Sequence, residues 1–221
     1  MGSITTAMLA SAKRDFLNGI HCFAQSRSFT CTSTSTATVV GVSPPLAVAT
    51  PVIRGEQVSG TNVSAGTVVA RILSSTSIQL NQAPSAAITA FTVAGDVFKM
   101  ALIQGTPTGN YSVTNTNYTD ITGNSDETTG TGYTAGGQAL TNVDPIATSP
   151  SAFTNFSPNP TWVSSSFSTS GCMIYNSTQN GPIATPGVSV HSFGGIQTVA
   201  SGTFTAVMPT AAVGTAVLQI T

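Results

Sequence analysis

Only six basic and seven acidic residues occur in this 221-residue chain, so its net charge is −1 and charged residues make up 6 % of the sequence, against about a quarter in ordinary soluble domains. No basic residue lies beyond Lys99 and no charged residue beyond Asp144. This excludes the clustered positive charge of a nucleic-acid-binding surface. No apolar run reaches the roughly 18 to 20 residues of a membrane span. We therefore expect neither nucleic acid nor membrane as a partner.

The first predicted element is a helix over residues 3–19. Met8, Ala12 and Phe16 follow one another at intervals of four, which places them on one helical face. Gly19 can terminate the helix, because glycine readily adopts the left-handed conformation found after helix ends. The apolar stripe is narrow, as in a helix that lies on a sheet or on a neighbouring subunit.

Residues 29–93 change in character and predict a small β module. Thr/Ser-rich stretches, prolines and glycines divide this range into short runs that are typical of strands. The clearest strands are residues 67–73 and 77–80, joined by the turn-prone segment 74–76. We expect this module to be inserted into a larger domain.

From residue 94 onward the pattern predicts the main domain. Residues 96–103 alternate and then become continuously apolar, as in a strand that enters a covered core. Residues 105–137 are rich in Thr, Asn and Gly, and they predict long exposed loops with one short helical turn. Further strands are predicted at residues 138–143, 152–156, 161–169, 171–175, 188–193, 203–208 and 216–220.

Together these elements predict a mainly β chain, an antiparallel β-sandwich or barrel with one N-terminal helix and an inserted small β domain. Residues 1–28 would supply the helix and a lead-in strand, residues 29–93 the inserted module, and residues 94–221 the main sandwich domain. The sole tryptophan, Trp162, is expected to anchor the interior, since a large aromatic side chain buries the most surface.

The sequence contains few side chains that could act in catalysis. His21 closes the predicted helix and His191 lies within a predicted strand, and neither has a metal-ligating companion at a recognised spacing. Three cysteines, an odd number without a CxxC pair, predict neither a disulfide framework nor a zinc site. We expect no catalytic, cofactor-binding or metal-binding residues, no cofactor, and no enzymatic activity.

The adjacent carboxylates Asp126 and Glu127 are the one alternative. They would serve as an acid/base pair or a cation site, yet neighbouring residues on a strand point to opposite faces. Because they lie within the loop-rich range 105–137, we expect them to be solvated loop charges.

Three segments outside the module carry a resemblance to known proteins: Asp96–Leu102, Ser125–Gly137 and Gly171–Asn176. They are similar to a family of tailed-bacteriophage virion structural proteins. The middle one, with Gly-Thr-Gly-Tyr-Thr-Ala-Gly-Gly, is the most specific, and the start of the chain is similar to the same family at residues 4–8 and 19–21. This chain departs from the family by the inserted module and by Ser192, where an acidic residue is commoner.

The resemblance implies a virion component that is assembled in the host cytoplasm. With the scarcity of charge, it favours a capsid decoration (cement) protein that binds the major capsid protein and copies of itself as a homotrimer. The N-terminal helix would then anchor the protein and the module would face outward.

Two other roles stay open. One is a tail, neck or head-fibre component. The other is a module that binds a glycan or protein of the host surface, with Tyr111, Tyr118 and Tyr133 as stacking surfaces.

Overall fold

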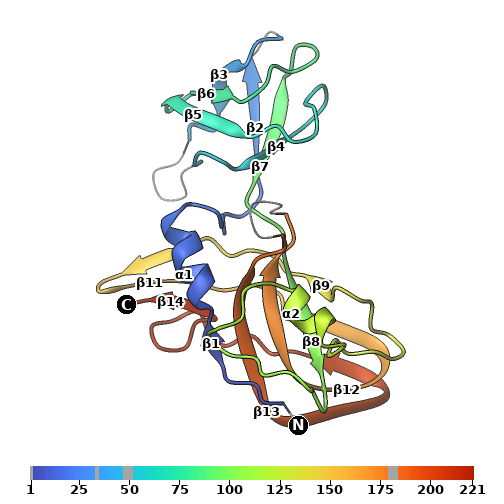
Figure 1. Ribbon diagram of the computed structural model, residues 1–221. Coiled ribbons are helices and arrows are strands. Elements are labelled where there is room, and N and C mark those ends of the chain that lie inside the picture. Colours follow the sequence, from blue (N-terminus) through green and yellow to red (C-terminus); the bar gives the residue numbers. More distant parts are fainter. Residues whose placement is uncertain (1, 33–34, 47–51, 179–183) are drawn as a thin grey trace. The chain divides into compact units, whose positions relative to one another are not determined.

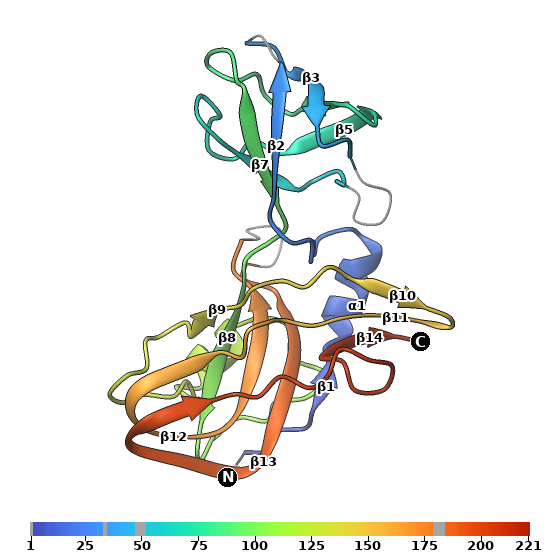
Figure 2. The ribbon, with the colours of Figure 1, turned by 180° about the vertical axis from the view of Figure 1, so that it is seen from behind.

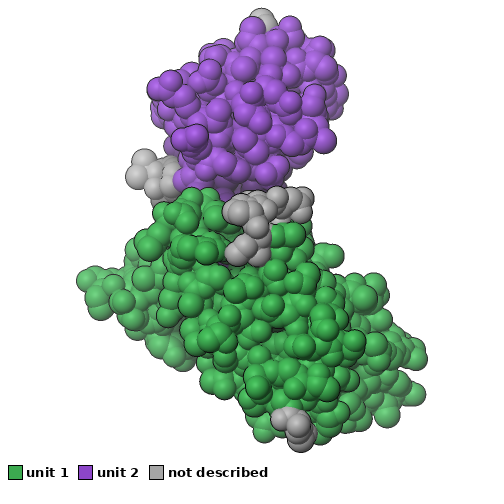
Figure 3. All heavy atoms as spheres, in the orientation of Figure 1, with its two compact units in different colours: residues 1–21, 97–221 green, residues 22–96 purple. Residues whose placement is uncertain are grey.

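The computed structural model is built mainly on antiparallel sheets, and it describes every residue except 1, 33–34, 47–51 and 179–183. The predicted fold class, mainly β with one N-terminal helix, is confirmed (Figure 1). The chain divides into two compact units, coloured separately in Figure 3: unit 1 comprises residues 1–21 and 97–221, and unit 2 comprises residues 22–96. No helix of the described chain is long and apolar enough to cross a membrane.

The N-terminal helix of unit 1 is shorter than predicted. Helix α1 spans Ala10–Leu17, and residues 3–9 are not helical. Strand β1 (Ala7–Met8) pairs instead with Val190 and Ser189 at a sheet edge. The β-branched residues at positions 4 to 6 favour this extended conformation. Gly19 has a φ of +65°, as expected for the glycine that follows a helix end.

The main sheet of unit 1 has the order β1-β13-β12-β8-β9. Its centre is a long antiparallel pair, β12 (Thr161–Asn176) and β13 (Gly187–Thr205), which we call the β12–β13 ribbon (Figure 1). Strand β8 (Phe98–Gln104) pairs with β12 on the other side, and β9 (Gln138–Ala139) forms the far edge.

The ribbon merges four segments that the sequence predicts as separate strands. Gly194 and Ser201, which lie in the predicted break between residues 193 and 203, and Ser164, which lies within the strand predicted at 161–169, are irregularities inside the ladder. All three have positive φ values, and the pairing register shifts near each of them. A bulge absorbs extra residues and bends a strand without ending it. Glycine and serine therefore curve the ribbon here, where the sequence pattern predicted turns.

A second sheet in unit 1 has three short strands, in the order β10-β11-β14 (Figure 2). They span Ile146–Thr148, Ser151–Thr154 and Leu218–Ile220. The last strand of the described chain therefore pairs with a strand some 60 residues earlier, Phe153 facing Gln219. The strands predicted at residues 152–156 and 216–220 correspond to β11 and β14.

The main sheet is buried on both faces where β8 pairs with β12, whereas most of β13 is exposed. On one face Ala101, Ile103, Met173 and Val190 pack in a cluster with Leu9 and Ala12 at the start of the helical segment, and with Tyr111 and Ile121. On the other, aromatic side chains surround Trp162, which is 2 % exposed and packs beside Phe204 and Tyr133. The expected role of Trp162 as an interior anchor is confirmed.

Unit 2 is a small β-barrel. Its six strands run in the order β4-β7-β2-β3-β6-β5, and backbone hydrogen bonds from Val58 to Thr67 (2.8 Å) and from Val69 to Glu56 (3.0 Å) join the two ends of that order. Closure leaves little open strand edge. The strands are β2 (Arg27–Thr32), β3 (Thr38–Ser43), β4 (Gln57–Ser59), β5 (Val69–Ser74), β6 (Ser77–Leu80) and β7 (Ala90–Ala94).

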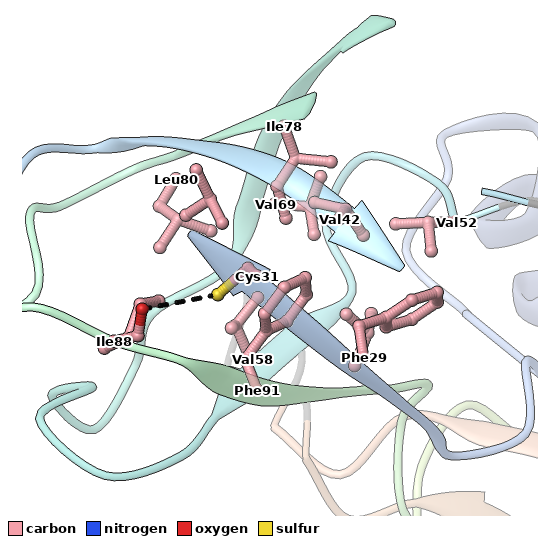
Figure 4. Packing of buried hydrophobic residues seen from close by; sticks show 12 residues of the cluster. Phe29, Cys31, Val42, Val52, Val58, Val69, Ile78, Leu80, Ile88 and Phe91 are labelled. Atoms are coloured by element: carbon pink, nitrogen blue, oxygen red, sulfur yellow. Dashed lines mark hydrogen bonds between the residues drawn. The ribbon is translucent and has the colours of Figure 1, made fainter. Parts of the chain in front are cut away.

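The core cluster of the barrel consists of apolar side chains and Cys31, with the rings of Phe29 and Phe91 stacked at 5.4 Å (Figure 4). The unit also begins earlier than the sequence predicts. Residues 22–28 belong to unit 2 and do not lead into the main domain, because β2 starts at Arg27 and pairs there with Val93.

The two ends of unit 2 are tied to each other. The Cys22 N–H donates to Asp96 Oδ2 (2.9 Å), and the Asp96 N–H donates back to the Cys22 carbonyl (2.8 Å). A Cβ at Gly95 would lie 2.5 Å from the carbonyl oxygens of Cys22 and Ala24, so only glycine allows this approach. The chain thus enters and leaves the barrel at adjacent points, as an inserted module requires.

A buried ion pair stabilises the barrel wall. Glu56 is fully buried, receives the Arg27 guanidinium, and accepts the Ile53 N–H at 2.8 Å. Removing one partner of such a pair leaves an uncompensated charge in the interior.

The variant Arg27→Ala should therefore destabilise unit 2 by about 3 kcal/mol. Amide hydrogen exchange across β2 and β7 should accelerate, whereas unfolding of unit 1, followed by Trp162 fluorescence, should not change. The matched control is Arg71→Ala, which removes an exposed arginine from β5. Equal effects of the two substitutions would contradict a special role for the Arg27–Glu56 pair.

Candidate functional site

The predicted solvation of Asp126 is wrong. Its side chain is fully buried, and five donor groups converge on its two oxygens. The backbone N–H groups of Thr108 (2.8 Å) and Gly109 (2.7 Å) donate to it, as do the hydroxyl of Tyr111 (2.7 Å) and the amide of Gln104 (2.7 Å). The fifth donor is the Thr108 hydroxyl.

These donors keep Asp126 ionised. Burial by itself raises the pKa of a carboxyl, but the hydrogen bonds from Gly109, Thr108, Tyr111 and Gln104 together outweigh burial and lower the pKa of Asp126 to about 2. Burial and the bond to this carboxylate raise the pKa of Tyr111. The Tyr111 ring itself is fully buried.

Glu127 organises the next part of the loop in the same way. It accepts the hydroxyls of Tyr118 (2.5 Å) and Tyr133 (2.7 Å) and the N–H of Gly136 (2.6 Å). Tyr118 also stacks on Tyr175 with ring centroids 4.5 Å apart. Burial, followed by the bond to Glu127, raises the pKa of Tyr118 and Tyr133.

The two carboxylates therefore act as structural acceptors and do not form an acid/base pair. Asp126 already accepts its full set of hydrogen bonds, and each residue serves a different group of donors. Residues 105–137 contain the expected short helical turn, α2 (Thr119–Gly123), and otherwise form loops whose residues are mostly exposed or half-buried, as the sequence predicts. The difference from the prediction lies in Asp126, which is buried inside these loops.

Two further carboxylates of unit 1 also accept hydrogen bonds from within the chain. Asp15 is buried and binds the Arg14 guanidinium at 2.7 Å, and Asp120 accepts the backbone N–H of Thr116 at 2.7 Å. With Glu56 and Asp96 in unit 2, the negative charge of this chain is largely committed to internal bonds.

The histidines lie apart in the fold. His21 Nδ1 contacts Asn176 Nδ2 at 3.1 Å, and burial lowers the pKa of His21 to about 4 although Asp15 opposes the shift. His191 Nε2 contacts Ser189 Oγ at 2.9 Å. Among the described residues, no group of three or more His, Cys, Asp or Glu side chains could hold a metal ion.

One thiol faces one imidazole. Cys172 lies directly across from His191 on the neighbouring strand. Burial raises the pKa of Cys172 to about 12 and lowers the pKa of His191 to about 4. Both groups are therefore neutral near pH 7, whereas a nucleophilic cysteine needs a thiolate.

The candidate binding surface is the outward side of the β12–β13 ribbon. We call it the ribbon face, and it is the side opposite Trp162, Phe167 and Phe204. It carries no formal charge, because the chain has none beyond Asp144. Val163 is 66 % exposed, and Val207, just beyond the end of β13, is 77 % exposed.

Hydroxyl groups on the ribbon face bond to one another across the strands. Thr161 Oγ1 lies 3.2 Å from Thr205 Oγ1, and Ser168 Oγ lies 2.9 Å from Thr198 Oγ1. A polar group that already has an internal partner loses little when water is removed from it. The ribbon face can thus be covered by another protein at a low desolvation cost.

Two adjoining shallow hollows lie beside this ribbon and share Gly105 and Ile196. Ile196 is 49 % exposed. The hollows contain no titratable side chain and so offer contact area without catalytic groups. Their other lining residues are Gly2, Ile4, Gln104, Thr106, Pro107, Thr129, Ser168, Ser170, Ser192 and Gly195.

Searches of protein-family models, curated proteins and solved structures each found no match to this chain.

The bonds to Asp126 predict a specific acid response of unit 1. The pKa of the Asp126 carboxyl falls from its ordinary value of 3.8 to about 2 on folding. As the pH drops, this carboxyl therefore binds a proton in the unfolded state before it does so in the folded state. The stabilisation, on the order of 2 kcal/mol, should be present above about pH 4 and lost progressively towards pH 2.

Denaturant unfolding followed by Trp162 fluorescence should show Asp126→Asn less stable than wild type at pH 7, with the gap narrowing between pH 4 and pH 2. Tyr111→Phe removes one of the five donors and should shift the lower end of this window upward. A gap that stays constant down to pH 2 would contradict the assignment.

Proposed function

We propose that this chain is a virion structural protein of a tailed bacteriophage, acting as a capsid decoration (cement) protein. The observation that carries the proposal is the ribbon face, which is uncharged, bears exposed valines, and has hydroxyl groups that are already paired. Such a surface suits lasting contact with another protein better than it suits exposure as a free monomer.

The mechanism is interfacial and involves no chemical step. Burying apolar surface contributes about 25 cal/mol per Å², and the contribution is repeated at every copy on a shell. Because few ion pairs take part, the contact does not weaken greatly when salt screens charges. A shell reinforced in this way resists internal pressure through the number of its contacts.

The partners in this proposal are the major capsid protein and copies of the chain itself, in a homotrimer. Closed symmetry satisfies contact surfaces without propagating into fibres. Unit 2, a closed barrel with its two ends tied together, serves as the outward module. The protein would be located in the virion.

A tail, neck or head-fibre component stays the alternative, since it would have the same composition and differ only in its position. Recognition of a host glycan through Tyr111, Tyr118 and Tyr133 is less favoured. Tyr111 is buried, and all three hydroxyls are bonded to Asp126 or Glu127, so these rings are not free stacking platforms.

The purified protein should bind emptied shells of the particle that carries it, and the affinity should fall only slightly between low and moderate ionic strength. Co-sedimentation at several salt concentrations measures this, and a map of the decorated particle locates the protein. A steep salt dependence, or placement on the tail, would contradict the cement role.

The ribbon face predicts the oligomeric state. Light scattering coupled to gel filtration should show a trimer for the wild type and a smaller species for the double variant Val163→Lys/Val207→Lys, because the interface would then bury charge. Leu73→Lys changes an exposed side chain of unit 2 and serves as control. A trimer that survives the double substitution would rule out the ribbon face as the contact between copies.

A further inference from the structure

The outer face of α1 is unlike the rest of the surface of unit 1. Ala10, Lys13, Arg14 and Leu17 are all exposed, and their spacing of three and four residues places them on one side of the helix. The opposite side carries Ala12 and Asp15, which are buried. We call the four exposed residues the outer face of α1.

This face combines positive charge with an unusually exposed apolar side chain. Leu17 is 90 % exposed, more than any other large apolar residue of the described chain. Two of the three basic residues of unit 1 lie beside it, the third being Lys99. Lys13 has no ion pair among the described residues.

Arg14 is held in place although it is largely exposed. Its Nε and Nη2 atoms both donate to Asp15 Oδ1, at 2.9 and 2.7 Å, and the Asp15 carboxylate is itself buried. The guanidinium is thus oriented before any partner arrives, which lowers the entropy lost on binding. Its side chain is 57 % exposed and can still reach a second acceptor.

We infer that the outer face of α1 docks on an acidic surface patch of a different protein, with Leu17 entering an apolar pocket next to it. Resting on the proposed function, the inference identifies that protein as the shell protein. Complementary charge decides the occupant. A second copy of this chain does not offer a suitable acidic patch, because carboxylates such as Asp120 and Asp126 already accept hydrogen bonds from within their own chain.

Other anionic partners fit less well. Two cations provide too few phosphate contacts to hold a nucleic acid at physiological salt. A lipid surface would require a longer amphipathic helix than the eight residues of α1. A lipid surface is one of the outcomes of the experiment.

The test measures binding of the full chain to emptied shells that lack it, and separately to vesicles containing phosphatidylglycerol. Lys13→Glu and Leu17→Ser should each weaken shell binding about tenfold, whereas Lys13→Arg should bind like wild type. The matched controls in unit 2, Arg71→Glu and Leu73→Ser, alter an exposed cation and an exposed leucine of β5. They should leave affinity unchanged. Trp162 fluorescence verifies that each variant is folded.

The outcomes separate the inference from the proposed function. If the wild type binds shells and the α1 variants bind equally well, the inference is overturned and the cement role stands. If the wild type does not bind shells, the proposed function fails and the inference with it. Vesicle binding that Lys13→Glu abolishes would overturn the inference in favour of a lipid surface.

Discussion

The hydrogen bonds that converge on the buried carboxylate of Asp126 hold the segment that follows β8 in place. A single ionised group collects donors from the end of β8, from the turn at Thr108 and Gly109, and from Tyr111. A buried carboxylate that lacked these donors would be costly, so their positions are closely constrained. Glu127, the next residue, fixes a second set of donors. The loops between β8 and β9 are thereby tied to β8.

This inward use of charge has a consequence for the surface. An acidic side chain that is engaged in an internal bond contributes little to solubility, and the chain has no acidic side chain beyond Asp144. The ribbon face must therefore stay compatible with water through hydroxyl groups, which also pair with one another. Neutral, internally satisfied surfaces associate through shape and apolar area. That property is the basis on which we propose a structural role in an assembly.

Local patterns predicted some elements well and others poorly. Strands β5 and β6 and the interior position of Trp162 followed from hydrophobic pattern and turn residues, because each depends on neighbours close in sequence or on side-chain size alone. The helix was overextended, since only the pairing of Ala7 with Val190 shows that the preceding segment is a strand. The ribbon was divided into four, because Gly194 and Ser201 suggest turns unless a partner strand continues past them.

The sequence by itself determined the class of the fold, the scarcity of charge and the lack of a recognisable catalytic motif, since these depend on composition and short-range periodicity. Only the tertiary structure decided the roles of Asp126, Glu127 and the tyrosines around them. Their donors are brought together by strand pairing and loop packing, over separations of 15 to 22 residues for Asp126 and 6 to 9 residues for Glu127, and no hydrophobic periodicity encodes these contacts. The same holds for the ribbon face and the outer face of α1, because exposure is a property of the packed chain.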